Sequence, residues 1–490
     1  MEIHRLSYEP LAQQALDEAL FLGASYADVR VIENKSRSLS TKNGIPTSLD
    51  YSESLGLGLR ILYMGAWGFA STNDLTKEAV IRIAFKAIKI AQASALTKKQ
   101  PVRLTEEPAI CEEWSTPYKI DPFSISIEEQ INFLLKIDEA LRKNKKISIA
   151  ETSMEFEREK KLFISSQGSR ILQNFITTGA GFVAMAYEDG ELQKRSFPNS
   201  FGGQHQRKGY ELVEELHLLE NASRIADEAV QLLKAPSCPA GPKDLILDSS
   251  QLGLQIHESV GHPIELDRVL GSEANYAGKS FLTLDQLHQL KYGSELVHVV
   301  ADARASHGPG LGTFGYDDEG IRAQCQDIIK DGQFVGYLTS RETAQTVGQT
   351  TSNGTMRAES WSNIPLIRMT NISLLPGTWE LENLIADTKD GIYLVTNHSW
   401  SIDDRRLNFQ FGTELGWEIK NGKITRLLKN PIYWGMTPQF WNSCDAICND
   451  KYWTLWGTPN CGKGQPCQTM GTGHGASPAR FRNVQIGASR

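Results

Sequence analysis

The sequence predicts an α+β fold in which helix–strand–helix modules precede a mostly β C-terminal domain. Before residue 235, segments with apolar residues at helical spacing alternate with runs of β-forming residues. Residues 235–242 read Ala-Pro-Ser-Cys-Pro-Ala-Gly-Pro, which is a rigid, helix-breaking linker. Beyond the linker, β-type runs and glycine turns dominate. These observations predict domains at residues 1–115, 116–236 and 237–490.

The first module is predicted as a helix, several strands and a second helix. The first helix begins at Pro10, a residue favoured in the first turn, and stops at Gly23. Asn43-Gly44 is the dipeptide most typical of a two-residue hairpin turn. Apolar residues from Leu75 to Ile90 recur every three or four positions and predict the second helix. The expected strands cover residues 27–33, 38–41 and 55–63.

The second module repeats this order of elements. Ser126 and Glu129 form a capping-box pattern ahead of an apolar helical stripe. A single long helix is expected from about Tyr210 to Lys234. Turns are predicted at Gln167-Gly168 and Asp189-Gly190. The strands between the helices are expected at residues 147–156, 161–165, 171–178 and 181–187.

Composition narrows the class of protein. The chain has 490 residues and a formal net charge of −7, so it has no general attraction for nucleic acid or an anionic membrane. The N-terminus does not read as a secretory signal, and no run reaches the roughly 18 apolar residues of a membrane helix. A soluble, cytoplasmic protein is therefore expected, and its seven cysteines are expected to be reduced, metal-binding or catalytic.

A predicted buried helix in the third domain carries residues suited to hydrolytic metal chemistry. It follows a strand at residues 244–248, with Ser249 or Ser250 as the N-cap, and it contains the stretch HESVGH from His257 to His262. Two neutral imidazoles can bind zinc and leave a coordination position open for water. A carboxylate beside them, here Glu258, can take the proton of that water and pass it to a leaving amine.

The spacing of the two histidines is unusual. They lie five residues apart, which places them about 140° from each other around a regular helix, so both cannot face one metal. A π-type bulge or a helix end corrects this angle. Gly261 loosens the turn and Pro263 cannot continue the hydrogen-bond ladder, so the helix is predicted to bulge or end at residues 261–263.

A catalytic zinc site needs a third protein ligand. The candidates are another histidine, Glu265, Asp267 or a C-terminal cysteine. Cys461 lies in the glycine-rich stretch NCGKGQP, where Lys463 is expected to favour the thiolate. Glu265 and Asp267 could instead orient the histidines, or could simply be exposed residues after the helix.

The C-terminal region allows three other interpretations. The stretch from Gly457 to Gly464 resembles a phosphate-binding loop but lacks the final Ser or Thr. A separate structural zinc site would use Cys461 with three other cysteines at irregular spacing, Cys444, Cys448 and Cys467. Cys461 could also be a nucleophile, although Glu258 would then have no clear role. His474 is expected in an exposed loop.

A further glycine-rich segment, residues 308–315, precedes the acidic run Asp317-Asp318-Glu319. A surface turn between strands is the first interpretation of this segment. The functional alternative is a flap whose backbone approaches an extended peptide substrate.

Most of the chain resembles the TldD/PmbA family, and the TldD branch in particular. Four linked motifs carry the resemblance: HESVGHPIE at 257–265, GTFGYDDEG at 312–320, PLIRMTN at 365–371 and NCGKGQ at 460–465. The chain departs from the family pattern at Asp267, where relatives commonly have glycine before the aspartate. It also departs in a lengthened segment at residues 442–450.

The resemblance implies a zinc metalloprotease with His257, His262 and Cys461 as ligands and Glu258 as the catalytic acid and base. It implies peptide or unstructured protein substrates that reach the site through a closed tunnel. It further implies a homodimer, or a heterodimer with a related TldE/PmbA-like chain. Two alternatives remain: a non-catalytic scaffold or partner subunit of such a complex, and a cysteine-dependent amidohydrolase acting through Cys461.

Overall fold

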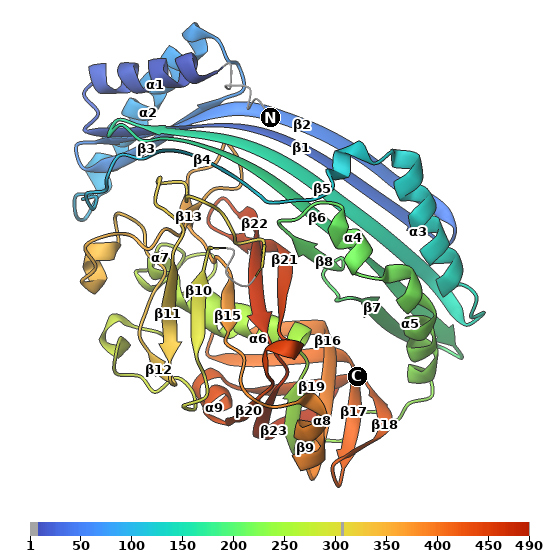
Figure 1. Cartoon of the computed structure of the whole chain (residues 1–490). Helices are drawn as coiled ribbons and strands as arrows, with labels where there is room; N and C mark the ends of the chain where they lie inside the picture. The colour runs from blue at the N-terminus through green and yellow to red at the C-terminus, as the bar shows by residue number, and fades with distance from the viewer. Residues whose placement is uncertain (1–7, 305–307, 490) are drawn as a thin grey trace.

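A computed structural model describes residues 8–304 and 308–489 of the chain. A long, curved sheet arches over a C-terminal body, and helices cover the outer face of the arch at both of its ends (Figure 1). This arrangement is the predicted α+β fold with a largely β C-terminal part. Within the described residues, no helix is long and apolar enough to cross a membrane.

The arched sheet is built by both N-terminal modules together. Its strand order is β3-β2-β1-β5-β6-β4, with β7 and β8 also pairing with β6. β1 pairs with β5 along nearly its whole length, so the strands of the two modules form one continuous sheet. The strands are β1 Tyr26–Lys42, β2 Ile45–Tyr63, β3 Ala66–Thr72, β4 Cys111–Ser115, β5 Ile147–Ser165, β6 Arg170–Glu188, β7 Glu191–Phe197 and β8 Gln204–Gln206.

These strands are longer than the sequence predicts, because polar stretches between the predicted runs also belong to them. Lys35, in the middle of β1, lies opposite Glu53 of β2 and forms an ion pair of 2.8 Å with it. Cross-strand pairs of opposite charge stabilise a sheet at positions that look like loops in the sequence. The predicted turns at Asn43-Gly44, Gln167-Gly168 and Asp189-Gly190 do lie between strands.

Two helix pairs cover the sheet, each with its own apolar core. The helices α1 and α2 pack at one end, over strands β1–β3, while α3 and α5 pack at the other, over β5 and β6. As predicted, the Ser126 side chain accepts a hydrogen bond from the Glu129 amide at the start of α3. The helices are α1 Glu9–Phe21, α2 Lys77–Thr97, α3 Ile127–Leu141, α4 Glu211–Glu215 and α5 Leu218–Leu232.

The single helix predicted from Tyr210 to Lys234 is wrong, because the chain breaks between α4 and α5. His217 adopts a left-handed conformation, with φ of 48°, which redirects the helix axis. The Glu211 carboxylate accepts hydrogen bonds of 3.0 Å from the amides of Lys119 and Ile120, which anchors α4 to the chain before α3. Both helices pack on β6 and contribute to the same apolar core, but the break at His217 separates them.

The C-terminal body contains a seven-stranded sheet with the order β16-β9-β23-β19-β17-β18, in which β20 also pairs with β23. A four-stranded sheet, β12-β11-β10-β15, and two hairpins complete the body. The seven strands are β9 Gly241–Leu247, β16 Asp390–Ile402, β17 Asn408–Lys420, β18 Lys423–Lys429, β19 Pro431–Met436, β20 Cys444–Ile447 and β23 Ala479–Ala488.

The helix α6, Ser249–Ile256, lies inside this body and packs against β15, β16 and the hairpin β21–β22. It is capped by the side chain of Asp248, rather than by Ser249 or Ser250 as predicted. The remaining strands are β10 Val299–Asp302, β11 Cys325–Lys330, β12 Gln333–Phe334, β13 Met356–Arg357, β14 Leu366–Ile367, β15 Ile372–Leu374, β21 Thr454–Lys463 and β22 Gln468–Ala476. The remaining helices are α7 Leu266–Val269, α8 Leu381–Asp387 and α9 Thr437–Asn442.

The acidic run after the glycine-rich segment joins the arch to the body. Residues 310–320 are buried, so the predicted surface turn is wrong. Glu319 forms an ion pair of 3.1 Å with Arg60 of β2, and Asp318 forms one of 2.9 Å with Lys161 of β5. Buried charges need such partners, and here the partners come from the sheet above. These ion pairs connect the arch to the chain segment after β10.

Candidate metal centre

The helix α6 changes its winding where the two histidines lie. Residues His257–Gly261 form a π turn and His262–Ile264 a 3-10 turn. The amide of His262 donates to the carbonyl of His257, five residues earlier, which is the hydrogen bond of a π turn. The two imidazole centroids consequently lie 4.9 Å apart on the same side of the helix. The predicted bulge is confirmed.

Pro263 leaves one backbone carbonyl of this turn without its usual partner. In a regular helix, the Ser259 carbonyl would accept from residue 263, but Pro263 has no amide hydrogen. The hydroxyl of the fully buried Tyr292 donates to this carbonyl instead. The side chain of Ser259 is held as well, since it accepts from Trp441 Nε1 at 2.9 Å. These contacts fix the shape of the turn on which both histidines lie.

Tyr292→Phe is expected to lower the free energy of unfolding by about 1–3 kcal/mol, because it leaves the Ser259 carbonyl buried and unpaired. Urea unfolding followed by tryptophan fluorescence measures the change. The control is Tyr118→Phe at an exposed tyrosine, which should alter stability by less than about 0.5 kcal/mol. Equal stability of the two variants would contradict the role given to Tyr292.

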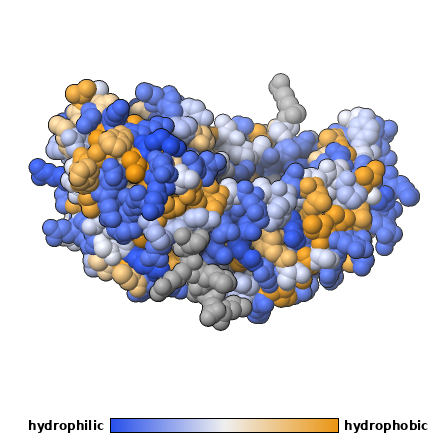
Figure 2. Space-filling model, turned by 90° about the horizontal axis from the view of Figure 1, so that it is seen from above, coloured by the Kyte–Doolittle hydropathy of each residue, from blue (hydrophilic) through white to orange (hydrophobic). Residues whose placement is uncertain are grey.

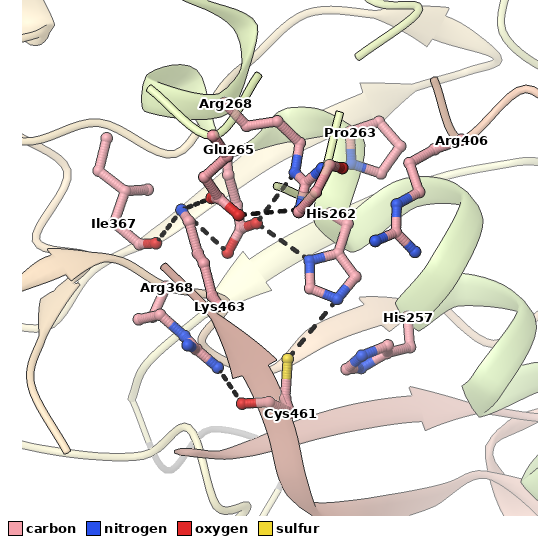
Figure 3. Close-up of polar contacts among 12 residues, drawn as sticks. His257, His262, Pro263, Glu265, Arg268, Ile367, Arg368, Arg406, Cys461 and Lys463 are labelled. Atoms are coloured by element: carbon pink, nitrogen blue, oxygen red, sulfur yellow. Dashed lines mark hydrogen bonds and ion pairs between the residues drawn. The ribbon is translucent and has the colours of Figure 1, made fainter. Parts of the chain in front are cut away.

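Three candidate ligand atoms converge below this turn. One ligand atom each of His257, His262 and Cys461 lies within 4.8 Å of the others, and all three residues are buried. His262 Nε2 and Cys461 Sγ are 3.6 Å apart (Figure 3). Cys461 belongs to β21, beside an irregularity in the β21–β22 pairing, and its carbonyl accepts from Arg368. The structure thus brings together the three residues that the sequence predicted as ligands.

The proton positions on His257 follow from a chain of hydrogen bonds. His474 Nδ1 lies 3.3 Å from the Ile372 carbonyl, which can only accept, so Nδ1 of His474 carries the proton. Its Nε2 must then accept from His257 Nδ1, 2.8 Å away. Nε2 of His257 is left with a free lone pair. Burial, and next the charges of His474 and His262, hold the pKa of His257 well below its usual range, which keeps the ring neutral.

The prediction that His474 lies in an exposed loop is wrong. This residue is 1% exposed and lies within β22, the strand paired with the strand of Cys461. Burial lowers the pKa of His474 to about 3. The surrounding glycines suggested a loop, but a glycine-rich strand lets the backbone approach other chain segments closely. For example, a Cβ at Gly473 would lie 2.1 Å from the Asn371 side chain.

The carboxylate of Glu265 orients the second imidazole. Glu265 Oε2 lies 3.0 Å from His262 Nδ1, which leaves Nε2 of His262 facing Cys461. Glu265 is fully buried, and Arg268 and Lys463 lie 3.8 and 3.4 Å from its oxygens. Of the two roles left open for Glu265, the structure therefore shows the orienting one. Burial, followed by the charges of Arg406 and Arg268, holds the pKa of His262 well below its usual range.

Lys463 lowers the pKa of the Cys461 thiol, as expected, but burial raises that pKa by more. Lys463 Nζ pairs with the carboxylate of Asp267 at 2.7 Å, and it also lies 3.5 Å from that of Glu273. Burial raises the pKa of the Cys461 thiol to about 11, although the charges of Arg368 and Lys463 lower it. The thiol in this setting needs a stronger cation nearby to become a thiolate.

Glu258 lies on the same turn and is held by a residue that sequence analysis missed. Arg406 Nη1 donates to Glu258 Oε2. Burial raises the pKa of Glu258, against the lowering effect of the Arg406 charge and a hydrogen bond from Trp400. Arg406 and Trp400 come from the end of β16 and the turn after it, about 150 residues downstream. No spacing pattern in the sequence links them to the helix.

The donor set suits zinc. Two neutral imidazoles with free Nε2 lone pairs and one cysteine sulfur form a three-ligand set of the kind found in catalytic zinc sites. Within residues 8–304 and 308–489, these three residues form the one group of His, Cys, Asp or Glu side chains compact enough to hold a metal. The separate structural zinc site considered for the C-terminal cysteines is therefore not formed.

Comparison with known proteins places the chain in a family. Three family models match it: PmbA/TldA metallopeptidase domain 1 at residues 27–91, the central domain at 120–235 and the C-terminal domain at 240–488. A Methanocaldococcus jannaschii protein named as a metalloprotease is 31% identical over 94% of this chain and 96% of its own. A Saccharolobus solfataricus protein named as a zinc metalloprotease TldD homolog is 24% identical over 88% of this chain and 90% of its own.

The fold has a counterpart among solved structures. TldE from Thermococcus kodakarensis superposes with a TM-score of 0.75 at 13% identity, covering 97% of this chain and all of that one. The fold, the three family models and a relative above 30% identity agree. The chain belongs to the PmbA/TldD metallopeptidase family.

Proposed function

We propose that this protein is a zinc-dependent peptidase that hydrolyses peptides or unstructured protein segments in the cytosol. The observation that carries the proposal is the convergence of ligand atoms of His257, His262 and Cys461. Glu258 lies on the same distorted helix turn as His257. Membership of a metallopeptidase family, and a relative named as a zinc enzyme, support the choice of zinc.

Zinc held by these three residues would be a Lewis acid that polarises an amide carbonyl and lowers the pKa of a water molecule. Glu258 then acts as the general base and later as the general acid. Its carboxylate takes a proton from the attacking water and delivers that proton to the nitrogen of the breaking C–N bond. The partners of the histidines, His474 and Glu265, hold both imidazoles in the tautomer that presents Nε2.

Two cavities lie between the arch and the body. One of about 250 Å³ and one of about 310 Å³ share Glu157 and Arg207 on the arch side and Pro459 and Gly471 on the β21–β22 hairpin. That hairpin also carries Cys461. Neither cavity is lined by His257, Glu258, His262 or Cys461, so a peptide in either one would lie beside the hairpin that carries Cys461 and not on the proposed ligands.

The proposed assembly is a homodimer or a heterodimer with a TldE/PmbA-like chain. The likeness of the fold to TldE is compatible with either. Figure 2 shows apolar groups toward both ends of the molecule as seen from above. Phe21 and Leu96, at the ends of α1 and α2, are 85% and 87% exposed, and large exposed apolar side chains are typical of contact surfaces. A purely scaffolding subunit would have no need of the three-residue donor set.

Chelation is expected to abolish peptide cleavage and added zinc to restore it. The assay uses an unstructured, fluorescently quenched peptide library, with metal content measured in parallel. A cysteine-dependent amidohydrolase would behave in the opposite way, resisting the chelator and losing activity on thiol alkylation. Cleavage that survives complete removal of metal would contradict the proposal.

His474→Phe is expected to weaken zinc binding by about 10- to 100-fold, because the acceptor that orients His257 is lost. Competition against a chromophoric chelator measures the affinity. The matched control is His398→Phe at an exposed histidine, which should bind zinc like the unmodified protein. Unchanged affinity in His474→Phe would remove this histidine from the site.

A further inference from the structure

The backbone of Arg406 has a positive φ and is held by several hydrogen bonds. It lies in the turn between β16 and β17 with φ of 64°, a left-handed conformation that few residues with side chains adopt. Its amide donates to the Asp403 carbonyl at 2.8 Å, and its carbonyl accepts from the Thr437 hydroxyl at 3.0 Å. The neighbouring carbonyl of Arg405 accepts from the Phe281 amide at 2.8 Å. Three segments of the body thus hold one strained residue in place.

The guanidinium of Arg406 has one buried hydrogen-bond donor without an acceptor in the described part of the chain. Nη1 donates to Glu258, whereas Nε is buried and has no partner among the described residues. The Arg406 side chain is 17% exposed and the Glu258 side chain is 7% exposed. Arg406 is therefore the more accessible member of this ion pair. Figure 3 shows it beside His262 and above the ring of His257. A buried N–H without an acceptor is costly and calls for an explanation.

We propose that Arg406 is a catalytic residue that donates hydrogen bonds to the oxygen of the amide under attack. The inference rests on the proposed peptidase function. In that reaction, the water oxygen bonds to the carbonyl carbon while Glu258 takes the water proton. The electron pair of the C=O bond moves onto the carbonyl oxygen, which becomes negative. When the C–N bond breaks, the pair returns and the proton passes from Glu258 to the nitrogen.

The positive charge and the N–H groups of Arg406 are suited to stabilising the negative charge on that oxygen. A fixed donor aimed at developing negative charge lowers the barrier, because the donor need not reorganise during the reaction. The bond from Nη1 holds the guanidinium beside Glu258, the proposed base, and Nε is left without an acceptor among the described residues. Strain in the backbone of a residue without an evident packing role is a recognised mark of such sites.

The experiment compares Arg406→Gly, Arg406→Lys and a neighbouring control, Arg405→Gly, in the zinc-loaded protein. Glycine suits a positive φ, so thermal melting should show that Arg406→Gly folds. We expect kcat to fall by about 10²- to 10³-fold in Arg406→Gly, less in Arg406→Lys, and not in Arg405→Gly, whose side chain is exposed. Zinc content should stay unchanged in all three variants.

Two further readouts separate catalysis from a structural role. Binding of a phosphonamidate peptide, measured by calorimetry, should weaken in Arg406→Gly by the same factor as kcat/KM, since this analogue carries the negative oxygen. Added guanidinium ion should partly restore the activity of Arg406→Gly. The inference is overturned if Arg406→Gly keeps its normal kcat, or if analogue binding is unchanged and guanidinium restores nothing. An unmodified protein that binds zinc but cleaves no peptide overturns the proposed function itself.

Discussion

Glu258→Gln is expected to lower kcat for peptide cleavage by about 10²- to 10⁴-fold and to leave zinc bound. Glutamine has the size of glutamate and retains an oxygen that can accept from Arg406 Nη1, so the site should keep its shape. It cannot, however, take a proton from water. The metal ligands are unchanged by this substitution. Single-turnover cleavage of a quenched peptide, together with elemental analysis, measures both quantities.

The control for this experiment is Glu295→Gln at an exposed glutamate, which should cleave at the normal rate. A Glu258→Gln protein with normal kcat would show that another group moves the proton. A variant that loses its zinc as well as its activity would also contradict the assignment, because Glu258 would then act on the metal site and not on the proton.

Cys461→Ser is expected to weaken zinc binding by more than about 100-fold, and cleavage should fail with it. The loss should exceed that caused by changing a partner of a ligand, because a direct bond to the metal is removed. A hydroxyl in this buried position is a far weaker ligand than a thiolate. Titration with zinc against a chromophoric chelator measures the affinity.

Cys467→Ser provides a matched control on the same hairpin, at an exposed cysteine. That variant should bind zinc and cleave peptide normally. If Cys461→Ser held zinc as tightly as Cys467→Ser does, the third ligand would have to be sought elsewhere. The cysteine-nucleophile alternative predicts a different pattern, in which Cys461→Ser loses activity although no metal is needed.

Much of the local structure could be predicted because its causes lie within a few residues of each other. The Ser126 cap and the Asn43-Gly44 turn depend on neighbouring groups, and both are observed. The same is true of the bulge at the histidines, which follows from their five-residue spacing together with Gly261 and Pro263. The fold class followed from the alternation of helical and β-type segments.

Two of the errors share one physical origin, which is contact with distant parts of the chain. His474 looked exposed because glycines surround it, yet β22 is buried between β21 and other elements of the body. The polar middle of β1 is typical of a break between strands, but Glu53 of β2 lies opposite Lys35 and forms an ion pair with it. The residues next to a position in the sequence determine neither its burial nor its cross-strand partner.

By itself, the sequence determined the types of donor, the base beside them and the helix distortion that lets two imidazoles face one point. These depend on backbone hydrogen bonding over a single turn. The tertiary structure alone decided that Sγ of Cys461 lies 3.6 Å from Nε2 of His262, 199 residues earlier in the chain. It also decided that His474 and Arg406 lie beside the set. Strand pairing and core packing bring these groups together, and such long-range contacts depend on the whole chain.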